Sequence, residues 1–446
     1  MLAGEERVAP YATDESRLGP YPPEAVVLCE TPEEVAAVLR LAKEHRVPVT
    51  PRGAGTGTTG GAVPVRGGIV LSTECMRRIL DIREKDLVAV VEPGVVLAVL
   101  QERVEERGLF YPPDPASLES CSLGGNVAEN AGGPRAFKYG VTRHYVLGLE
   151  LVLVGGERLR CGRHTVKGVT GYDLVSLIVG SEGTLAVVTE IVLRLLAKPE
   201  AVMTLLAVMP DAEKAACAVH NILRLGESPS VLEIMDGVTM DHIRRSGKGR
   251  PLPEAGAAVL CEFDGPSDLL EPLILRAAEA CERAMARDVF VARDERERRG
   301  IWQARRNASV AFRELHRFKV AHDIAVPLGA IQEMLRQLGQ IGARHGLTIG
   351  AYGHAGDGNL HVNIVHDEDP EDPRVARRVE AAVEELFRGA LSLGGTLSGE
   401  HGVGLTKRRY LGWEQQPSVI ALEKSLKRVF DPDGLLNPGK VFPEPV

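Results

Sequence analysis

Pro51-Arg-Gly-Ala-Gly-Thr-Gly-Thr-Thr-Gly-Gly61 is a glycine-rich stretch that follows a short predicted strand at 47–50. Residues 55–60 satisfy the GxGxxG pattern, but a proline and further glycines follow within residues 61–68. A Rossmann-type dinucleotide fingerprint needs a helix that starts inside the motif, and a helix cannot run through such a segment. We therefore reject the Rossmann interpretation. The loop can still present converging backbone N–H groups to an anion, and a surface loop without a ligand is the alternative.

Two further stretches of the same kind lie downstream. Cys121-Ser-Leu-Gly-Gly-Asn-Val-Ala-Glu-Asn-Ala-Gly-Gly133 is followed by Lys138-Tyr139-Gly140, and the third stretch runs from Gly180 to Thr189. The segment Tyr111-Pro-Pro-Asp-Pro-Ala-Ser117 lies between the first and second stretches. Loops of this composition concentrate at binding sites, although tight turns without a ligand would also account for the glycines.

Composition limits the class of protein. A chain of 446 residues is too long for one ordinary core, so two or three domains are expected. The net charge of −8 gives no reason to expect nucleic acid as a partner. The seven cysteines form no CxxC pair, which argues against a disulfide framework or a cysteine-ligated cluster and favours a reducing compartment. No signal peptide and no transmembrane helix is expected, so the predicted location is the cytoplasm.

The predicted elements indicate an α+β protein. Thr31 and Glu34 read as a capping box that opens a helix, and residues 146–154 and 184–196 read as long strands. After residue 200 the order is strand, helix, strand, helix. Residues 331–345 are then expected to be helical, with strands at 347–352 and 360–365, and with further helices at 373–394 and 417–430.

Gly353-His-Ala-Gly-Asp-Gly-Asn-Leu-His361 and Ser398-Gly-Glu-His401 hold the most reactive set of side chains. His361 lies on the strand after an Asp-Gly turn, and His354 lies at the other end of the loop, so their imidazoles can meet. Two imidazoles and the Glu400 carboxylate, with open positions, form the layout of a catalytic metal site. Zn²⁺ fits this set, while Mn²⁺ and Fe²⁺ are alternatives. From the residues alone, two ordinary polar histidines on a hairpin remain the simpler interpretation.

Taken together, the glycine stretches resemble the FAD-binding domain of the vanillyl-alcohol oxidase family. The whole chain, from about residue 17 to 443, resembles the group of D-lactate dehydrogenases, D-2-hydroxyglutarate dehydrogenases and glycolate oxidase flavoprotein subunits. This resemblance implies a PCMH-type FAD-binding domain of two subdomains at 17–198 and a ferredoxin-like α+β substrate domain with the metal site at 199–406. It also implies a C-terminal segment, 407–446, that returns to the flavin.

The resemblance assigns FAD contacts to all three stretches and to the C-terminal segment. Residues 51–61 would wrap the pyrophosphate, and the other loops would line the path of the adenine, ribose and isoalloxazine. Many relatives attach the flavin covalently through a histidine where this chain has Thr56, so non-covalent FAD is expected. The residues expected to bind FAD are Pro51, Arg52, Gly53, Ala54, Gly55, Thr56, Gly57, Thr58, Gly61, Pro113, Asp114, Ser117, Leu123, Gly124, Gly125, Asn126, Ala128, Gly132, Gly133, Tyr139, Gly140, Glu182, Gly183, Val188 and Asn437.

The resemblance also favours a functional metal site over ordinary polar histidines in the segments 353–361 and 398–401. It implies that His354, His361 and Glu400 are metal ligands and that His401 is the catalytic base. Beside a cation the protonated form of an imidazole is disfavoured, so His401 would be able to accept a proton. A fourth ligand is the alternative role for His401.

Substrate recognition is expected in the segment Trp302-Gln-Ala-Arg305-Arg306-Asn-Ala-Ser309, which reads as one helix with Arg305 and Ser309 on one face. Relatives grip the substrate carboxylate with an arginine at the position of Arg305, and a guanidinium matches a carboxylate bidentately. Helical spacing does not separate Arg305 from Arg306. Lys319 could add a second cation, although solvated charges are the alternative for both Arg305 and Lys319.

The expected function is metal-assisted oxidation of a D-2-hydroxy acid by FAD, with electrons passed to a quinone, a cytochrome, an electron-transfer flavoprotein or an iron–sulfur subunit. Peripheral contact with the inner face of the membrane and a homodimer are left open. Three alternatives remain: a non-redox alkyl-dihydroxyacetonephosphate synthase type of flavoenzyme, a flavin-carrying subunit of a glycolate oxidase complex, and an NADPH-dependent enolpyruvyl reductase.

Overall fold

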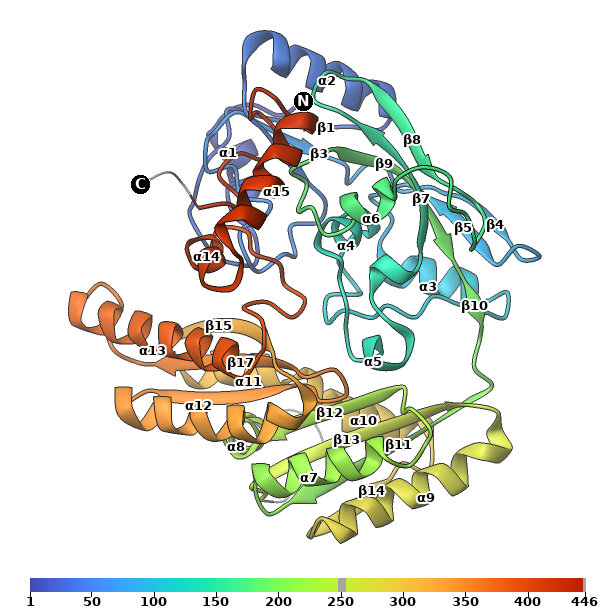
Figure 1. Ribbon diagram of the computed structural model, residues 1–446, viewed down its shortest axis with the longest axis vertical. Coiled ribbons are helices and arrows are strands. Elements are labelled where there is room, and N and C mark those ends of the chain that lie inside the picture. Colours follow the sequence, from blue (N-terminus) through green and yellow to red (C-terminus); the bar gives the residue numbers. More distant parts are fainter. Residues whose placement is uncertain (248–253, 444–446) are drawn as a thin grey trace. The chain divides into compact units, whose positions relative to one another are not determined.

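A computed structural model describes residues 1–247 and 254–443, and their contacts divide the chain into two units (Figure 1). Unit 1 comprises Met1–Gly132, Gly140–Lys198 and Glu400–Val446, and unit 2 comprises Gly133–Tyr139 and Pro199–Gly399. Two segments lie in a different unit from the one implied by the expected domain boundaries at residues 198 and 406. Residues 133–139 belong with unit 2, because Lys138 and Tyr139 bind Asp264 there, and residues 400–406 belong with unit 1.

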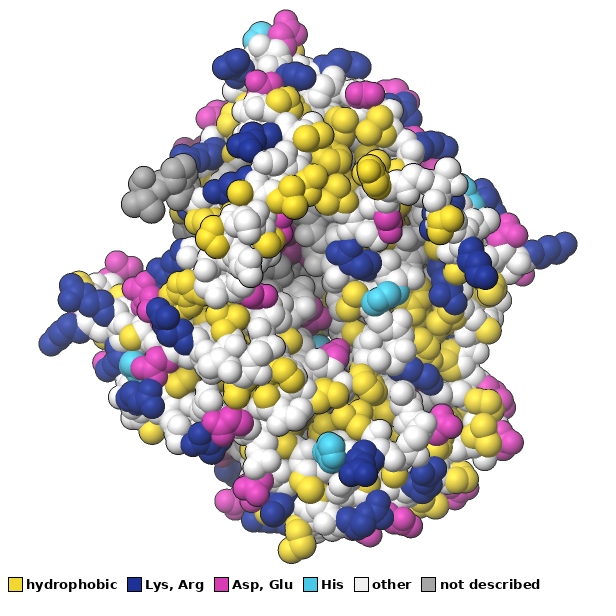
Figure 2. Space-filling view, viewed as in Figure 1, with side chains coloured by type: hydrophobic (Ala, Val, Ile, Leu, Met, Phe, Trp, Pro, Cys, Tyr) yellow, Lys and Arg dark blue, Asp and Glu magenta, His cyan; other side chains and the backbone are white. Residues whose placement is uncertain are grey.

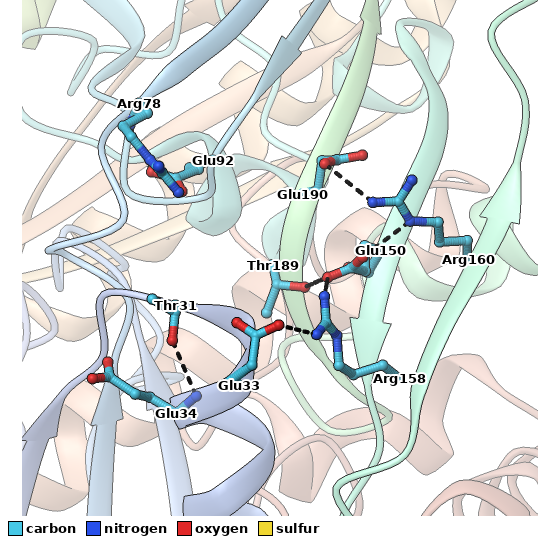
Figure 3. A network of polar contacts seen from close by, with 10 residues as sticks. All are labelled: Thr31, Glu33, Glu34, Arg78, Glu92, Glu150, Arg158, Arg160, Thr189 and Glu190. Carbon is cyan, nitrogen blue, oxygen red and sulfur yellow. Dashed lines mark hydrogen bonds and ion pairs between the residues drawn. The ribbon is translucent and has the colours of Figure 1, made fainter.

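Unit 1 begins with a small parallel sheet of order β1-β3-β2, formed by Ala25–Leu28, Ile69–Ser72 and Val49–Arg52. Helix α2 (Pro32–His45) packs on it. Half of the predicted capping box is present: Thr31 Oγ1 accepts from the Glu34 amide at 3.2 Å (Figure 3). The Glu34 carboxylate accepts from the Glu30 amide, one residue before the cap, at 2.7 Å and not from the Thr31 amide. The bond to Thr31 satisfies an amide of the first helical turn that has no partner inside the helix, and the bond to Glu34 holds the segment that leads into the helix.

The second sheet of unit 1 is antiparallel, with the order β4-β5-β9-β7-β8, formed by Ile79–Arg83, Val88–Val91, Val187–Arg194, Val146–Val152 and Arg158–Gly162. Buried Glu150 on β7 accepts from Arg158 at 3.1 Å and from Arg160 at 3.0 Å, both on β8 (Figure 3). Arg158 also pairs with Glu33 of α2. This network ties the edge of the second sheet to the helix that covers the first.

The remaining elements of unit 1 are short, apart from α3 (Leu97–Glu105) and α15 (Pro417–Phe430). No residue of α15 is fully buried, and Val419, Leu422 and Val429 expose apolar side chains; apolar atoms gather in this part of the surface in Figure 2. The short elements are α1 (Glu5–Val8), η1 (Ala9–Tyr11), β6 (Leu109–Phe110), α4 (Leu123–Glu129), η2 (Thr142–His144), α6 (Leu174–Ile178), β10 (Leu196–Ala197), η4 (Arg408–Tyr410) and α14 (Leu411–Glu414).

Unit 2 is built on one antiparallel sheet of order β14-β11-β13-β12-β16-β17-β15, formed by Asp288–Val291, Ala201–Met209, Ala257–Gly265, Val231–Asp236, Thr348–His354, Asn359–His366 and Phe318–Ala325. One face is covered by α7 (Ala212–Leu223), α9 (Ser267–Arg283), α12 (Ile331–His345) and α13 (Pro373–Ser392) (Figure 1). The other face is covered by α8 (Gly237–Ser246), α10 (Glu295–Arg306) and α11 (Ala308–Leu315). The short elements α5 (Ala136–Tyr139) and η3 (Leu328–Ala330) complete the unit.

Two sequence-based expectations for unit 2 need correction. The single helix expected through residues 302–309 is wrong, because α10 ends at Arg306 and α11 begins at Ala308. Arg305 and Ser309 therefore lie on different helices. The strand β12 and the helix α8 were not expected at all. Among the residues that the structure describes, none of the helices combines the length and the apolar character needed to cross a membrane.

Candidate functional site

The three glycine stretches and the C-terminal segment meet within unit 1. A Cβ atom on Gly53 would lie 2.2 Å from Ser122 Oγ, so the first and second stretches touch there. A Cβ atom on Gly183 would lie 3.5 Å from Pro51, which joins the third stretch to the first. Asn437 Nδ2 donates to the carbonyl oxygens of Gly61 at 3.0 Å and Glu182 at 2.8 Å. Residues far apart in the sequence thus form one cradle.

The first stretch has the irregular conformation that its composition predicts. After β2 ends at Arg52, no helix occurs in the described residues 53–96, which confirms that the loop is not a Rossmann turn. The Arg52 guanidinium donates to the carbonyl oxygens of Thr13 at 2.8 Å and Ala62 at 3.5 Å. Its side chain therefore anchors the N-terminal segment, while its backbone ends the strand that leads into the cradle.

The cradle has features that suit a large polar cofactor such as the expected FAD. Ser122 caps α4 by accepting from the Gly125 amide at 3.3 Å, which turns the start of the second stretch into a helix. A Cβ atom on Gly57 would meet nothing within 4 Å, so the first loop borders open space. Asn126 is buried, and its Nδ2 has no acceptor among the described residues. A buried donor without an acceptor fits a position that faces a bound group.

The other residues expected at the cofactor are divided between the two units. Leu123, Gly124 and Ala128 lie on α4, where the Ala128 carbonyl accepts from the Glu182 amide at 2.9 Å. Gly132 and Gly140 flank the segment that belongs to unit 2, and this segment contains Gly133 and Tyr139. The Tyr139 hydroxyl donates to Asp264 at 2.9 Å. The Pro113 carbonyl accepts from Gln101 at 2.9 Å in the loop that also holds Asp114 and Ser117, and Val188 lies on β9.

The loop that carries His401 is held by residues of the cradle. The Glu182 carboxylate accepts from the amides of Val403 at 2.8 Å and Gly404 at 2.7 Å. Thr59 Oγ1 donates to the His401 carbonyl at 3.2 Å. Glu182 has φ +52°, a left-handed conformation that non-glycine residues rarely adopt and that often marks functional sites. The sequence predicted Glu182 as a cofactor contact, but it did not reveal this second role.

A second carboxyl group lies beside Glu182. Burial, and next the charge of Glu182, raise the pKa of Glu129 well above its usual value. Burial also raises the pKa of Glu182, although the two amides that it accepts from lower it. Glu129 Oε2 is buried without a partner among the described residues. Two adjacent buried carboxylates cannot easily both ionise, so we expect Glu129 to carry the proton at neutral pH.

Replacing Glu129 with glutamine is expected to stabilise the protein increasingly as pH rises. The pKa of Glu129 is higher in the folded than in the unfolded chain. Between these two pKa values folding takes up a proton, so the free energy of unfolding falls as pH rises from the lower value to the higher one. Each pH unit costs the wild type about 1.4 kcal/mol there, and a neutral amide avoids that cost. The measurement is the free energy of unfolding with excess FAD between pH 5 and 8. The exposed Glu119→Gln is the control, and a difference that does not change with pH would contradict the prediction.

Replacing Gly53 with valine is expected to remove the flavin from the purified protein. The new side chain would collide with Ser122, whose hydroxyl cannot rotate away without losing the α4 cap, so the first two stretches must separate. We expect FAD affinity to fall at least about 100-fold, as for other losses of several kcal/mol. Flavin absorbance per chain measures the effect. Gly412→Ala, where the added Cβ atom meets nothing within 4 Å, should retain full flavin content.

The expected metal ligands lie on the hairpin β16–β17 of unit 2. His354 Nε2 and His361 Nε2 are 3.4 Å apart. Two imidazole nitrogens on one tetrahedral Zn²⁺ would be separated by about 3.3 Å, because each Zn–N bond is about 2.0–2.1 Å long. The same distance also permits a hydrogen bond between the rings in metal-free protein. The hairpin turn at Asp357-Gly358, with Gly358 at φ +83°, forms as predicted.

Glu400 completes the candidate set. One ligand atom from each of His354, His361 and Glu400 can be chosen so that all lie within 4.8 Å of one another. Glu400 is the first residue of the last segment of unit 1 and directly follows Gly399, the last residue of unit 2. Two nitrogens and a carboxylate oxygen at these distances suit a divalent cation with open positions.

His354 is oriented by a residue that the sequence did not single out. Glu233 on β12 is fully buried; it accepts from His354 Nδ1 with one carboxylate oxygen and from Arg305 Nε with the other. Burial alone would raise the pKa of Glu233, but Arg305 and His354 outweigh burial and lower this pKa to about 2. The carboxylate is therefore ionised at neutral pH. The pattern Val231-Leu-Glu-Ile-Met235, an acid inside an apolar strand, was the only signal for it.

The two arginines that helical spacing could not separate have different surroundings. Arg305 is 8% exposed and lies 4.5 Å from the centre of the Tyr352 ring, whereas Arg306 lies over the Trp302 ring at 5.8 Å. Arg305 is thus the one that neighbours the metal hairpin. Ser309 and Lys319 are brought together separately, because Lys319 Nζ donates to Ser309 Oγ at 2.5 Å.

Comparison with known proteins identifies both halves of the chain. Residues 23–162 match the model of the FAD binding domain, and residues 198–441 match that of the FAD linked oxidases, C-terminal domain. The chain is 42% identical to the glycolate oxidase subunit GlcD of Bacillus subtilis (strain 168), over 94% of this chain and 89% of that protein. It is 36% identical to D-lactate dehydrogenase of Anaerostipes hadrus, over 99% of this chain and 94% of that protein.

The fold is also similar to solved structures. p-Cresol methylhydroxylase aligns with a TM-score of 0.80 at 17% identity, over 99% of this chain and 93% of that chain. This likeness confirms the predicted PCMH-type α+β fold. The matches to the two FAD-linked family models support the predicted cofactor, FAD. The chain belongs to the family of FAD-linked oxidases and is an FAD-dependent oxidoreductase.

Proposed function

We propose that this protein oxidises a D-2-hydroxy acid, such as D-lactate or glycolate, to the 2-oxo acid. One observation carries the substrate class. Arg305 and His354 bind opposite oxygens of a single Glu233 carboxylate, so a carboxylate-binding guanidinium and a metal-ligating imidazole are neighbours in unit 2. A 2-hydroxy acid presents a carboxylate and a hydroxyl on adjacent carbons, so it needs a carboxylate-binding cation and a hydroxyl-binding metal side by side.

His354, His361 and Glu400 would hold the divalent cation, Zn²⁺ or Mn²⁺. Such an ion supplies a Lewis acid that lowers the pKa of a coordinated hydroxyl. Glu233 keeps His354 in the tautomer that carries its proton on Nδ1, so that Nε2 offers a lone pair. Arg305 would bind the substrate carboxylate bidentately with its terminal nitrogens.

His401 would accept the hydroxyl proton as general base. Its loop is fixed from two sides, by Glu182 through Val403 and Gly404 and by Thr59 through the His401 carbonyl. A fixed main chain limits the positions that the imidazole can sample, which is what a proton acceptor requires. When bound, FAD would supply the acceptor for the C2 hydrogen and its electron pair.

The cradle of unit 1 would hold FAD without a covalent bond, because Thr56 offers no nucleophilic nitrogen. Acid precipitation should therefore release all the flavin into the supernatant. The two electrons must then pass to a second molecule: a quinone, a cytochrome, an electron-transfer flavoprotein or an iron–sulfur subunit. The seven cysteines form no CxxC pair that would suggest a cluster in this chain.

The test is anaerobic absorbance of the flavin in the purified protein, with D-lactate, L-lactate, glycolate and D-2-hydroxyglutarate added separately, before and after treatment with EDTA. Bleaching by a D-2-hydroxy acid that EDTA abolishes and Zn²⁺ or Mn²⁺ restores is the expected result. Full flavin content without bleaching by any of the four acids would overturn the proposal. That outcome would favour the alkyl-dihydroxyacetonephosphate synthase type or a flavin-carrying subunit, whereas bleaching by NADPH would indicate a reductase.

A further inference from the structure

Glu233 occupies a position that links two parts of the proposed site. It lies on β12, the central strand of the unit 2 sheet, and its side chain is fully buried. One carboxylate oxygen accepts from His354 Nδ1 and the other from Arg305 Nε. We propose that Glu233 is a positioning residue that couples metal binding by His354 to substrate binding by Arg305. This inference rests on the proposed function, because it takes His354 as a ligand and Arg305 as the carboxylate-binding group.

On the metal side, the bond from His354 Nδ1 sets both the tautomer and the plane of the ring. His354 is only 4% exposed and lies at the end of β16, where it forms an edge-to-face pair with His361 at 5.2 Å between ring centres. Without its acceptor, the His354 ring could place its proton on Nε2, the nitrogen that faces His361. Carboxylate partners of this kind typically improve metal affinity 10–100-fold.

On the substrate side, Glu233 determines which nitrogen of Arg305 bonds within the protein and which nitrogens remain for a substrate. The Nε atom is committed to Glu233, and the Tyr352 ring supports the guanidinium at 4.5 Å. The terminal nitrogens are then the pair that can grip a substrate carboxylate in a planar, bidentate manner. If Glu233 lost its charge, Arg305 would keep its contact with Tyr352 but lose the bond that fixes its rotation.

The neighbouring strand offers a natural control. Glu262 on β13 is 2% exposed and accepts from Arg298 of α10 at 2.9 and 3.1 Å. It also accepts from Trp302 Nε1 at 2.8 Å and from Thr204 Oγ1 at 2.6 Å. Arg298 and Arg305 are seven residues apart on the same helix, and each is held by a buried glutamate of the sheet. The partners of Glu262 are not proposed site residues, so its loss should affect folding alone.

The experiment compares Glu233→Gln with Glu262→Gln in the purified flavoprotein. The readouts are Zn²⁺ affinity by competition with a chromophoric chelator, flavin content, thermal unfolding, and KM and kcat for D-lactate. For Glu233→Gln we expect Zn²⁺ affinity to fall 10–100-fold and KM to rise at least about tenfold, with flavin content unchanged. For Glu262→Gln we expect a lower unfolding temperature and a Zn²⁺ affinity within about threefold of the wild type.

A double-mutant cycle separates coupling from simple damage. Arg305→Met should lower Zn²⁺ affinity in the wild-type background, since Glu233 would lose the partner that fixes one of its carboxylate oxygens and would hold the His354 ring less precisely. In the Glu233→Gln background the same substitution should have little further effect. Glu233→Asp keeps the charge on a shorter side chain that cannot reach both partners, so its Zn²⁺ affinity should also fall while its fold is retained. This variant keeps the test valid if Glu233→Gln does not fold.

Three results would overturn the inference. In the first, Glu233→Gln and Glu233→Asp retain wild-type Zn²⁺ affinity and KM, and differ from the wild type only in unfolding temperature, as Glu262→Gln does. In the second, the effects of Arg305→Met and Glu233→Gln on Zn²⁺ affinity are additive. In the third, the wild type binds no divalent ion. Measurement of Zn²⁺ affinity needs no turnover, so failure of the proposed reaction would be seen separately. In that case the wild type would bind Zn²⁺, but no hydroxy acid would bleach its flavin.

Discussion

Replacing His401 with asparagine is expected to slow anaerobic reduction of the flavin by D-lactate about 10²- to 10⁴-fold, which is the range for loss of a general base. Flavin content should be unchanged, because Glu182 and Thr59 bind this loop through its backbone amides and the His401 carbonyl, which the substitution leaves in place. Zn²⁺ content should also be unchanged. Stopped-flow absorbance at saturating substrate measures the reduction step directly.

The control for His401 is His220→Asn, an exposed histidine on α7 that should reduce its flavin at the wild-type rate. If His401→Asn instead lost its Zn²⁺, the residue would be a fourth ligand. A rate within tenfold of the wild type would remove His401 from the mechanism.

Replacing His361 with alanine is expected to abolish stoichiometric binding of the divalent ion, and with it the reaction. The variant leaves only one imidazole and Glu400, and the His354 Nε2 atom loses the partner nitrogen at 3.4 Å. Because the Lewis acid supplies several kcal/mol of stabilisation, flavin reduction should slow by about 10³-fold or more. Elemental analysis gives the metal content, and added Zn²⁺ or Mn²⁺ should fail to restore the rate.

His366→Ala is a matched control, because His366 lies on the same strand and its ring stacks on Phe318 at 5.4 Å. It should retain metal and activity, although its unfolding temperature should fall. If wild type treated with EDTA reduces its flavin as slowly as His361→Ala does, the assignment of His361 as a metal ligand is supported. Full activity of His361→Ala after chelation would contradict metal assistance altogether, while leaving the FAD-linked oxidase family assignment intact.

Much of the fold was predictable because the signals are local. The helix at 331–345 and the helix beginning at Pro417 have the bounds that were expected, and Thr31 caps its helix as predicted, although Glu34 binds the Glu30 amide and not the Thr31 amide. The approach of the His354 and His361 imidazoles was also predictable, because an Asp-Gly turn joins the two strands that carry them, although in the register His354 lies opposite Asn359 and His361 opposite Tyr352. Three glycine stretches indicated a cofactor cradle before any contact between them was known.

The errors arose where neighbours remote in sequence decide the local structure. Helical periodicity continues through residues 302–309, yet the chain changes course at Asn307. On one side Arg305 is drawn to Glu233, and on the other Phe312 stacks on His242 at 4.3 Å. The units to which residues 133–139 and 400–406 belong also depend on remote partners, which are Asp264, Glu182 and Thr59.

By itself, the sequence determined the class of fold, the exclusion of a Rossmann turn, and the residue types that can bind FAD and a metal. These follow from turn chemistry and from periodicity over a few residues. Only the tertiary structure decided which buried carboxylates serve the site. Glu233 reaches partners 72 and 121 residues away, and Glu182 reaches amides 221 and 222 residues away. Such contacts depend on strand order and packing, which no local pattern encodes.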